Sequence, residues 1–136
     1  MHFKGERVLM RIHIGERDKY NGKPLYQEIV ELLRRREYAG ATVVRAIMGF
    51  GASSKIHTDR FLELSLDLPI IIEVVETEDN IEAVLPELDK MIGGGLITLE
   101  RAKVIMYRPD IPAPQRRPST TMDITGSWEV KPKDDS

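Results

Sequence analysis

Apolar residues occupy every second position of Val8–Ile14, and this period of two residues predicts a β-strand with one buried face. Two further stretches, Thr42–Phe50 and Pro69–Glu76, are rich in β-branched residues and predict a second and a third strand. Three consecutive isoleucines at 70–72 indicate that the third strand is central and covered on most of both faces. Lys103–Tyr107 is predicted to be the fourth strand.

Two stretches have helical spacing instead. Pro24 suits the first turn of a helix, and an apolar stripe with spacing i, i+4, i+7 and i+8 follows it at Leu25, Ile29, Leu32 and Leu33. Thr77–Asn80 offers a cap and first-turn carboxylates for a second helix, whose stripe is Ile81, Val84, Leu85, Leu88 and Ile92. Gly40 and Gly93–Gly95 are expected to end the two helices, and Pro86 predicts a kink or a restart.

The predicted elements follow one another as strand, helix, strand, strand, helix and strand, with Leu96–Leu99 as a candidate for a short additional strand. This order predicts an α+β fold, the ferredoxin-like plait (βαββαβ), with a four-stranded antiparallel sheet and two helices on one face. The other face would leave Val, Ile and Met side chains in water, and an exposed apolar patch usually marks a partner surface. Self-association is the simplest way to cover it.

Composition narrows the class of protein. The 136 residues carry a formal net charge of −2 at pH 7, so no overall basic field favours nucleic acid as a partner. The absence of Cys excludes disulfides and thiolate metal sites and is compatible with a reducing cytoplasm. No apolar run of about 18 residues would span a membrane, and Met1–Arg7 lacks the apolar core of a signal peptide. We therefore expect a cytoplasmic protein without membrane insertion.

The composition changes after Arg108. Prolines punctuate residues 109–136, which predicts a Pro-rich extended tail with little core of its own, whereas residues 1–108 are expected to form one domain. The exception in the tail is Ile124–Val130, which contains Trp128. We interpret Trp128 as an anchor against the body or a neighbouring subunit, with a lid over a ligand site as the alternative.

A polar stretch of unusual length, residues 52–68, separates the second and third strands. Most connections in compact domains are about 4–6 residues long, and a loop of this length usually carries function. Around it, the strings Thr42-Val43, Gly49-Phe50-Gly51, Lys55-Ile56-His57-Thr58 and Ile72-Glu73-Val74-Val75 resemble the core of PII signalling proteins. More closely, residues 7–108 resemble the PII-like domain of unknown function 190 (DUF190) through the strings 11–16, 22–26, 49–54 and 56–58.

The resemblance implies a homotrimer of ferredoxin-like subunits whose sheets line the central interface and whose intersubunit clefts bind adenine nucleotides. It implies a non-catalytic signal-transduction protein whose loop, here residues 52–68, docks on a membrane transporter or an enzyme. It also assigns a hinge and part of the nucleotide cleft to Gly49, Phe50 and Gly51. It assigns a phosphate loop to Gly93, Gly94 and Gly95, and the phosphate-binding lysine to Lys103.

General chemistry is compatible with these roles and also with plainer ones. Glycines let backbone N–H groups approach an anion, and a lysine supplies a point charge to a phosphate. However, Gly93–Gly95 lacks the spacing of a P-loop, and its plainer interpretation is a helix C-cap and turn. The loop is shorter than in PII proteins and lacks their modified tyrosine, and their basic pair after the last strand is absent in recognisable form. Arg108, Arg116 and Arg117 are its candidate replacements.

Catalysis is not expected. Ser53, Ser54, His57 and Asp59 crowd one loop, whereas catalytic groups need fixed geometry and usually converge from separate elements. We therefore predict no catalytic residues, and we interpret these four as a solvated polar loop.

A metal site is not expected either, because the three histidines, His2, His13 and His57, show no ligand spacing. A carboxylate-assisted site with Glu16, Asp18 or Asp59 stays open as an alternative. Besides the nucleotide-binding regulator, two further hypotheses therefore remain: a non-catalytic trimeric interaction protein and a divalent-metal-binding protein.

Overall fold

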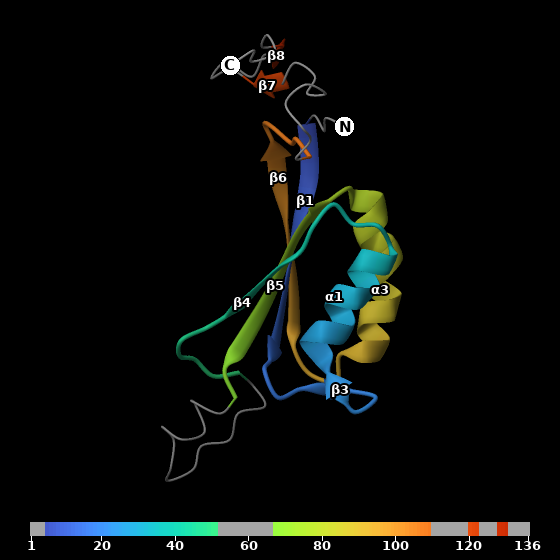
Figure 1. The fold of residues 1–136 in the computed structure, drawn as a ribbon, viewed down its shortest axis with the longest axis vertical. Helices are drawn as coiled ribbons and strands as arrows, with labels where there is room; N and C mark the ends of the chain where they lie inside the picture. Colours follow the sequence, from blue (N-terminus) through green and yellow to red (C-terminus); the bar gives the residue numbers. More distant parts are fainter. Residues whose placement is uncertain (1–4, 52–66, 110–119, 123–127, 131–136) are drawn as a thin grey trace. The chain divides into compact units, whose positions relative to one another are not determined.

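The computed structural model describes residues 5–51, 67–109, 120–122 and 128–130 (Figure 1). The helices are α1 (Leu25–Arg35) and α3 (Glu78–Met91), and the strands are β1 (Gly5–Gly15), β2 (Lys19–Tyr20), β3 (Lys23–Pro24), β4 (Thr42–Arg45), β5 (Pro69–Glu76), β6 (Leu96–Val104), β7 (Thr120–Met122) and β8 (Trp128–Val130). The chain divides into two compact units, residues 8–101 and the pair of segments 1–7 and 102–136. Among the described helices, neither is long and apolar enough to cross a membrane.

Four strands form one sheet in the order β4-β5-β1-β6. The central strand β5 runs antiparallel to both β1 and β4, and α1 and α3 lie on the same face of the sheet (Figure 1). The α+β ferredoxin-like plait predicted from the element order is therefore confirmed. We call the face that carries neither α1 nor α3 the open face.

The core lies between the sheet and the two helices. Alternate residues of β1 and β5 point to this side, because side chains of a strand alternate between its faces. The predicted stripe of α1 is buried along its whole length, and in α3 Ile81, Val84 and Leu88 are buried. The buried apolar side chains are Met10, Ile12, Ile14, Leu25, Ile29, Leu32, Leu33, Ile70, Ile72, Val74, Ile81, Val84 and Leu88.

Helix α1 ends earlier than the sequence suggested. Gly40 was expected to end it, but the last helical residue is Arg35 and Glu37 takes a left-handed conformation with φ of 60°. The amide of Tyr38 donates to Leu33 O at 3.1 Å, and that of Glu37 donates to Arg34 O at 3.0 Å. These two bonds form a Schellman motif, which satisfies the last carbonyls without a glycine. The motif, not Gly40, therefore ends the helix.

Helix α3 begins at the predicted cap. The Thr77 hydroxyl accepts a hydrogen bond from the Asn80 amide at 3.2 Å, which satisfies one of the first free N–H groups. The helix then continues as one element to Met91, with Pro86 inside it. Of the two alternatives predicted at Pro86, the restart is therefore wrong, and the kink stays a prediction.

A buried carboxylate links the start of α3 to the segment after α1. Glu76 is 6% exposed and accepts hydrogen bonds from the amide of Thr77 at 3.1 Å and from Asn80 Nδ2 at 3.2 Å. The Tyr38 hydroxyl donates to Asn80 O at 2.7 Å. Burial, with the nearby negative charge of Glu76 as a smaller cause, raises the pKa of Tyr38 to about 12. Hydrogen bonding thus satisfies the one acid that is buried among the residues of described burial, and it fixes this corner of the fold.

Three strands differ from their predicted bounds. β1 extends beyond the predicted Val8–Ile14 at both ends. β4 ends at Arg45 and does not reach Phe50, because its partner β5 begins at Pro69. The amide of Ala46 donates to Pro69 O at 2.9 Å, but Pro69 has no N–H to continue the ladder. The last strand of the sheet is β6, Leu96–Val104, so the prediction of Lys103–Tyr107 placed it seven residues too late at its start.

Two short strand pairs complete the described structure. β2 and β3 form a hairpin whose two-residue loop, Asn21–Gly22, has positive φ at both positions, as a type I′ turn requires. β7 and β8 pair antiparallel within the predicted tail. Residues 110–119, 123–127 and 131–136 lie outside the described residues, and the division of the chain at residue 108 stays a prediction.

Candidate functional site

The open face presents alternate side chains of the central strands β1 and β5. Ile12 and Ile72 lie opposite each other and point into the core, so the residues on either side of them point away from the helices. His13, which the sequence placed on the sheet surface or at a subunit contact, lies on this face and is partly buried. The cross-strand pairs of the open face are Leu9–Val75, Arg11–Glu73 and His13–Ile71.

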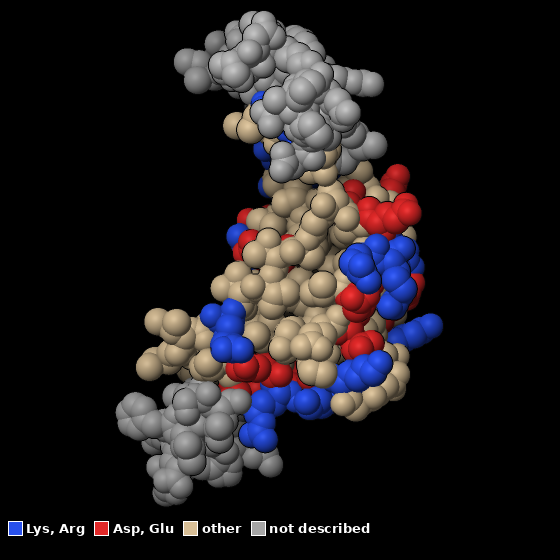
Figure 2. Space-filling view, in the orientation of Figure 1, with Lys and Arg blue, Asp and Glu red and all other residues tan. Residues whose placement is uncertain are grey.

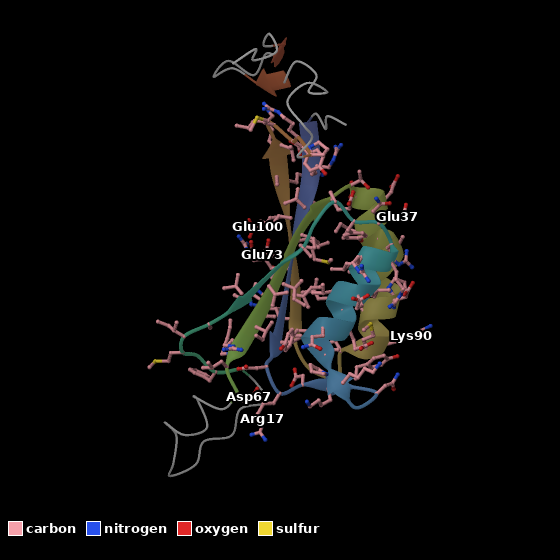
Figure 3. All side chains as sticks on the ribbon, in the orientation of Figure 1. Arg17, Glu37, Asp67, Glu73, Lys90 and Glu100 are labelled. Carbon is pink, nitrogen blue, oxygen red and sulfur yellow. The ribbon has the colours of Figure 1, made fainter. Side chains whose placement is uncertain are left out.

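Three charged side chains meet at the middle of the open face, and we call them the acid–arginine cluster. Arg11 Nε donates to Glu73 Oε1 at 3.0 Å, and Arg11 Nη1 donates to Glu100 Oε1 at 2.7 Å. Figure 3 shows Glu73 and Glu100 together on the side of the sheet that faces away from the helices. The hydrogen bond with Glu73 raises the pKa of Arg11 above its ordinary value, so the guanidinium stays charged. Two carboxylates thus share one cation.

Apolar side chains surround this cluster. Val44 pairs with Ile71 across β4 and β5, and Val44 and Val75 keep 45% and 42% of their surface exposed. Ile97 packs against the core while Glu100 meets Arg11, so alternation along β6 places Leu96, which is 57% exposed, on the open face. The open face is therefore a mostly apolar surface with a charged centre, which is the composition of a protein contact rather than of a freely solvated face.

The segment after β4 contains the first group of predicted site residues. A Cβ atom at Gly49 would lie 2.9 Å from Pro69 Cγ, so this glycine is needed for the close approach of the two chain segments. Phe50 is 81% exposed, and a Cβ atom at Gly51 would meet nothing within 4 Å. Ile47, which is 98% exposed, makes the same segment apolar at its tip. The structure thus gives Gly49 a packing role and leaves Phe50 available for a ligand or partner.

The turn Gly15–Asp18 contacts the C-terminal end of the long loop and the last residue of β4, an arrangement that the sequence did not indicate. The amide of Glu16 donates to Leu68 O at 2.9 Å, and that of Arg17 donates to Asp67 Oδ1 at 3.0 Å. At the end of β4, Arg45 Nη2 lies 3.0 Å from Glu16 Oε1. Arg17 and Asp67 lie near each other at this end of the sheet in Figure 3. Residues 52–66 lie outside the described residues, as do the catalytic candidates Ser53, Ser54, His57 and Asp59.

The second group, Gly93–Gly95, connects α3 to β6 and contains two kinds of glycine. A Cβ atom at Gly95 would lie 2.7 Å from His13 O, so β1 packs directly against this position. At Gly93 and Gly94 a Cβ atom would meet nothing within 4 Å. Gly95 therefore has a structural role, and only Gly93 and Gly94 leave room for an anion to approach the backbone.

The remaining predicted residue, Lys103, is exposed near the end of β6, in the unit formed by residues 1–7 and 102–136. Gly49–Gly51 and Gly93–Gly95 belong to the unit of residues 8–101. Across the described parts of the chain, no group of three His, Cys, Asp or Glu side chains is arranged to hold a metal ion.

In Figure 2, Lys and Arg side chains and Asp and Glu side chains gather over the helices, and neutral side chains fill much of the surface beside them. The acid–arginine cluster joins residues that are 62 and 89 positions apart in sequence. No local motif signals such a cluster, and only the strand register brings it together.

Comparison with known proteins identifies relatives of the part of the chain that contains both helices and nearly all of the sheet β4-β5-β1-β6. A family model described as Uncharacterized ACR and designated DUF190 matches residues 7–104, which contain both helices and end at the last residue of β6. A UPF0166 protein of Aquifex aeolicus (strain VF5) is 37% identical over 100 residues, which are 74% of this chain and 94% of that protein. A UPF0166 protein of Methanocaldococcus jannaschii is 40% identical over 92 residues, 67% of this chain and 84% of that protein.

Proposed function

The chain belongs to the DUF190 family, and we propose that it is a non-catalytic regulator of the PII-like kind. In this proposal three copies associate through their open faces, a small effector binds between them, and the loop of residues 52–68 acts on a partner protein such as a transporter or an enzyme. The observation that supports it best is the open face, one side of a four-stranded sheet whose two helices lie on the other side.

Association is supported by the side chains that the single chain leaves in water. Val44, Val75 and Leu96 lie on the open face and are each more than 40% exposed. Burial of apolar surface contributes roughly 25 cal/mol per Å² and is the main favourable term in protein association. Because each copy has such a face, association that covers the open faces is favoured over leaving them exposed to water.

An adenine nucleotide is the effector that the resemblance to PII proteins favours. Phe50 is 81% exposed at the start of the long loop, so its ring can stack on a purine. Gly93 and Gly94 have open space beside their backbone, where a phosphate can approach. Lys103 is the cation that the resemblance assigns to the phosphate.

Isothermal titration tests effector binding directly. AMP, ADP, ATP and cyclic dinucleotides are titrated, with and without Mg²⁺, into the wild type, Phe50→Ala and Ile47→Ala. Ile47 is the matched control, because it is an exposed apolar residue of the same segment. We expect saturable binding of at least one nucleotide to the wild type and to Ile47→Ala, and weaker binding to Phe50→Ala. If none of these nucleotides binds to the wild type, the proposal that a nucleotide is the effector is contradicted.

A trimeric interaction protein without a nucleotide is the second candidate. It is favoured by the position of Gly93 and Gly94 directly after α3, because the negative end of a helix dipole opposes an anion there. A defined oligomer that binds none of the nucleotides would favour this candidate. Both candidates use the open face in the same way.

A further inference from the structure

The acid–arginine cluster is not electrically balanced. Glu73 and Glu100 bring two negative charges and Arg11 brings one positive charge, so the cluster carries a net charge of −1. In the single chain this charge is tolerated because Glu100 is 59% exposed to water. When a partner covers the face, water leaves and an unbalanced charge becomes costly unless the partner supplies a cation or a hydrogen-bond donor.

One more ionisable side chain lies on the open face within residues 8–101 that the structure describes, and it is His13. Its cross-strand neighbour is Ile71, and Val44 lies opposite Ile71 on β4. The charged groups that share its face are therefore Arg11 on its own strand, Glu73 on β5 and Glu100 on β6. The nearest arginine of β4, Arg45, is paired with Glu16 at 3.0 Å.

We propose that His13 of a neighbouring copy completes the acid–arginine cluster when two open faces associate, so that self-association takes up protons. This rests on the association proposed above and identifies what regulates it. Each copy carries one surplus carboxylate and one imidazole on the same face. One imidazolium per copy restores neutrality, and in a closed ring of identical copies each copy can provide it to the next.

A second copy fits this surface better than an unrelated apolar partner. A purely apolar partner would cover Val75 and Leu96 but would leave the surplus charge of Glu73 and Glu100 without a counter-charge. A second copy supplies both the apolar surface and the missing donor. The charged centre thus makes the open face specific for a second copy of the same chain, because polar groups inside an interface can determine which partner binds.

The sign of the pH dependence follows from linkage. If the assembled state binds a proton at His13 more tightly than the free chain, association strengthens as the pH falls through the histidine range. One proton per copy changes the association constant by at most about tenfold per copy and per pH unit.

Sedimentation equilibrium between pH 8 and pH 5.5 tests this at constant ionic strength. The variants are His13→Gln, Glu100→Gln and, as the matched control, the double variant His2→Gln/His57→Gln, which keeps His13 as the only histidine. We expect association of the wild type and the double variant to tighten at least tenfold between pH 8 and pH 6. His13→Gln should change less than twofold, and Glu100→Gln should associate more tightly than the wild type at pH 8.

The outcomes separate this inference from the proposed function. A wild type that is oligomeric but shows no pH dependence overturns the role of His13 and leaves the proposed assembly intact. The same holds if His13→Gln keeps the full pH dependence, or if Glu100→Gln associates more weakly at pH 8. A wild type that stays monomeric throughout the pH range overturns both. Circular dichroism shows whether each variant is folded. If His13→Gln does not fold, the result for Glu100→Gln still decides the test.

Discussion

The substitution Gly95→Ala tests the structural role of Gly95 in the turn between α3 and β6. An added Cβ would lie 2.7 Å from His13 O and 3.2 Å from the Cγ2 atoms of Ile14 and Ile92. Carbon and carbonyl oxygen normally stay at least about 3.3 Å apart, so β1 and β6 must separate locally by about half an ångström. The change is thus an overpacking of the strand contact and not a loss of an interaction.

The expected magnitude combines two opposing terms. Overpacking of this kind destabilises by about 1–3 kcal/mol. Replacing glycine by alanine also restricts the unfolded chain, which stabilises by about 0.4–1 kcal/mol. With the middle of each range, the net loss for Gly95→Ala is about 1.3 kcal/mol, or a fall in Tm of roughly 3–8 °C for a chain of this size.

Gly94→Ala is the matched control, because a Cβ atom there would meet nothing within 4 Å. Urea titrations of both variants are compared with the wild type at one protein concentration, since association changes apparent stability. We expect Gly94→Ala to lie within about 1 kcal/mol of the wild type or above it. Equal stabilities of the two variants would refute the distinction between a structural Gly95 and an unconstrained Gly94.

Three further predictions concern single residues. Glu37→Gly should stabilise the fold by about 0.5–1 kcal/mol in urea titrations, because Glu37 has φ of 60° at the position of the Schellman motif where glycine is preferred; a destabilised variant would contradict this. Because the pKa of Tyr38 is raised to about 12, its contribution is complete below pH 10 and is lost as the pH rises towards 12. With solvent screening this amounts to about 1 kcal/mol, so the stability difference between wild type and Tyr38→Phe should shrink over that range and should otherwise be constant. Lys103→Ala should weaken a phosphate-bearing ligand by roughly 1.5–3 kcal/mol in isothermal titration without changing the oligomer, and unchanged affinity would place the phosphate contact elsewhere.

The sequence was most informative where chemistry marks an element at both ends. Pro69–Glu76 forms a strand with the predicted bounds, because Pro69 cannot extend the ladder and Thr77 caps the following helix. The end of β4 was not predictable in the same way. It depends on where its partner begins, and the exposed residues after Arg45 have the same apolar composition as the strand itself.

The candidate site was predicted only in part. Local composition drew attention to Gly49–Gly51 and Gly93–Gly95, but it could not separate glycines that pack from glycines that leave open space. The acid–arginine cluster could not be predicted at all, because Arg11 meets Glu73 and Glu100 only through the register of three strands. Long-range pairing of this kind is a property of the folded sheet and not of any segment.

The mass of the wild type in solution tests the central claim most directly, because the effector cleft and the use of the open face both depend on assembly. Light scattering coupled to size-exclusion chromatography is performed at micromolar concentration and pH 6. Association of three copies predicts a single species with three times the 15.5 kDa mass of the chain. A species of 15.5 kDa that persists as the concentration is raised would contradict the claim.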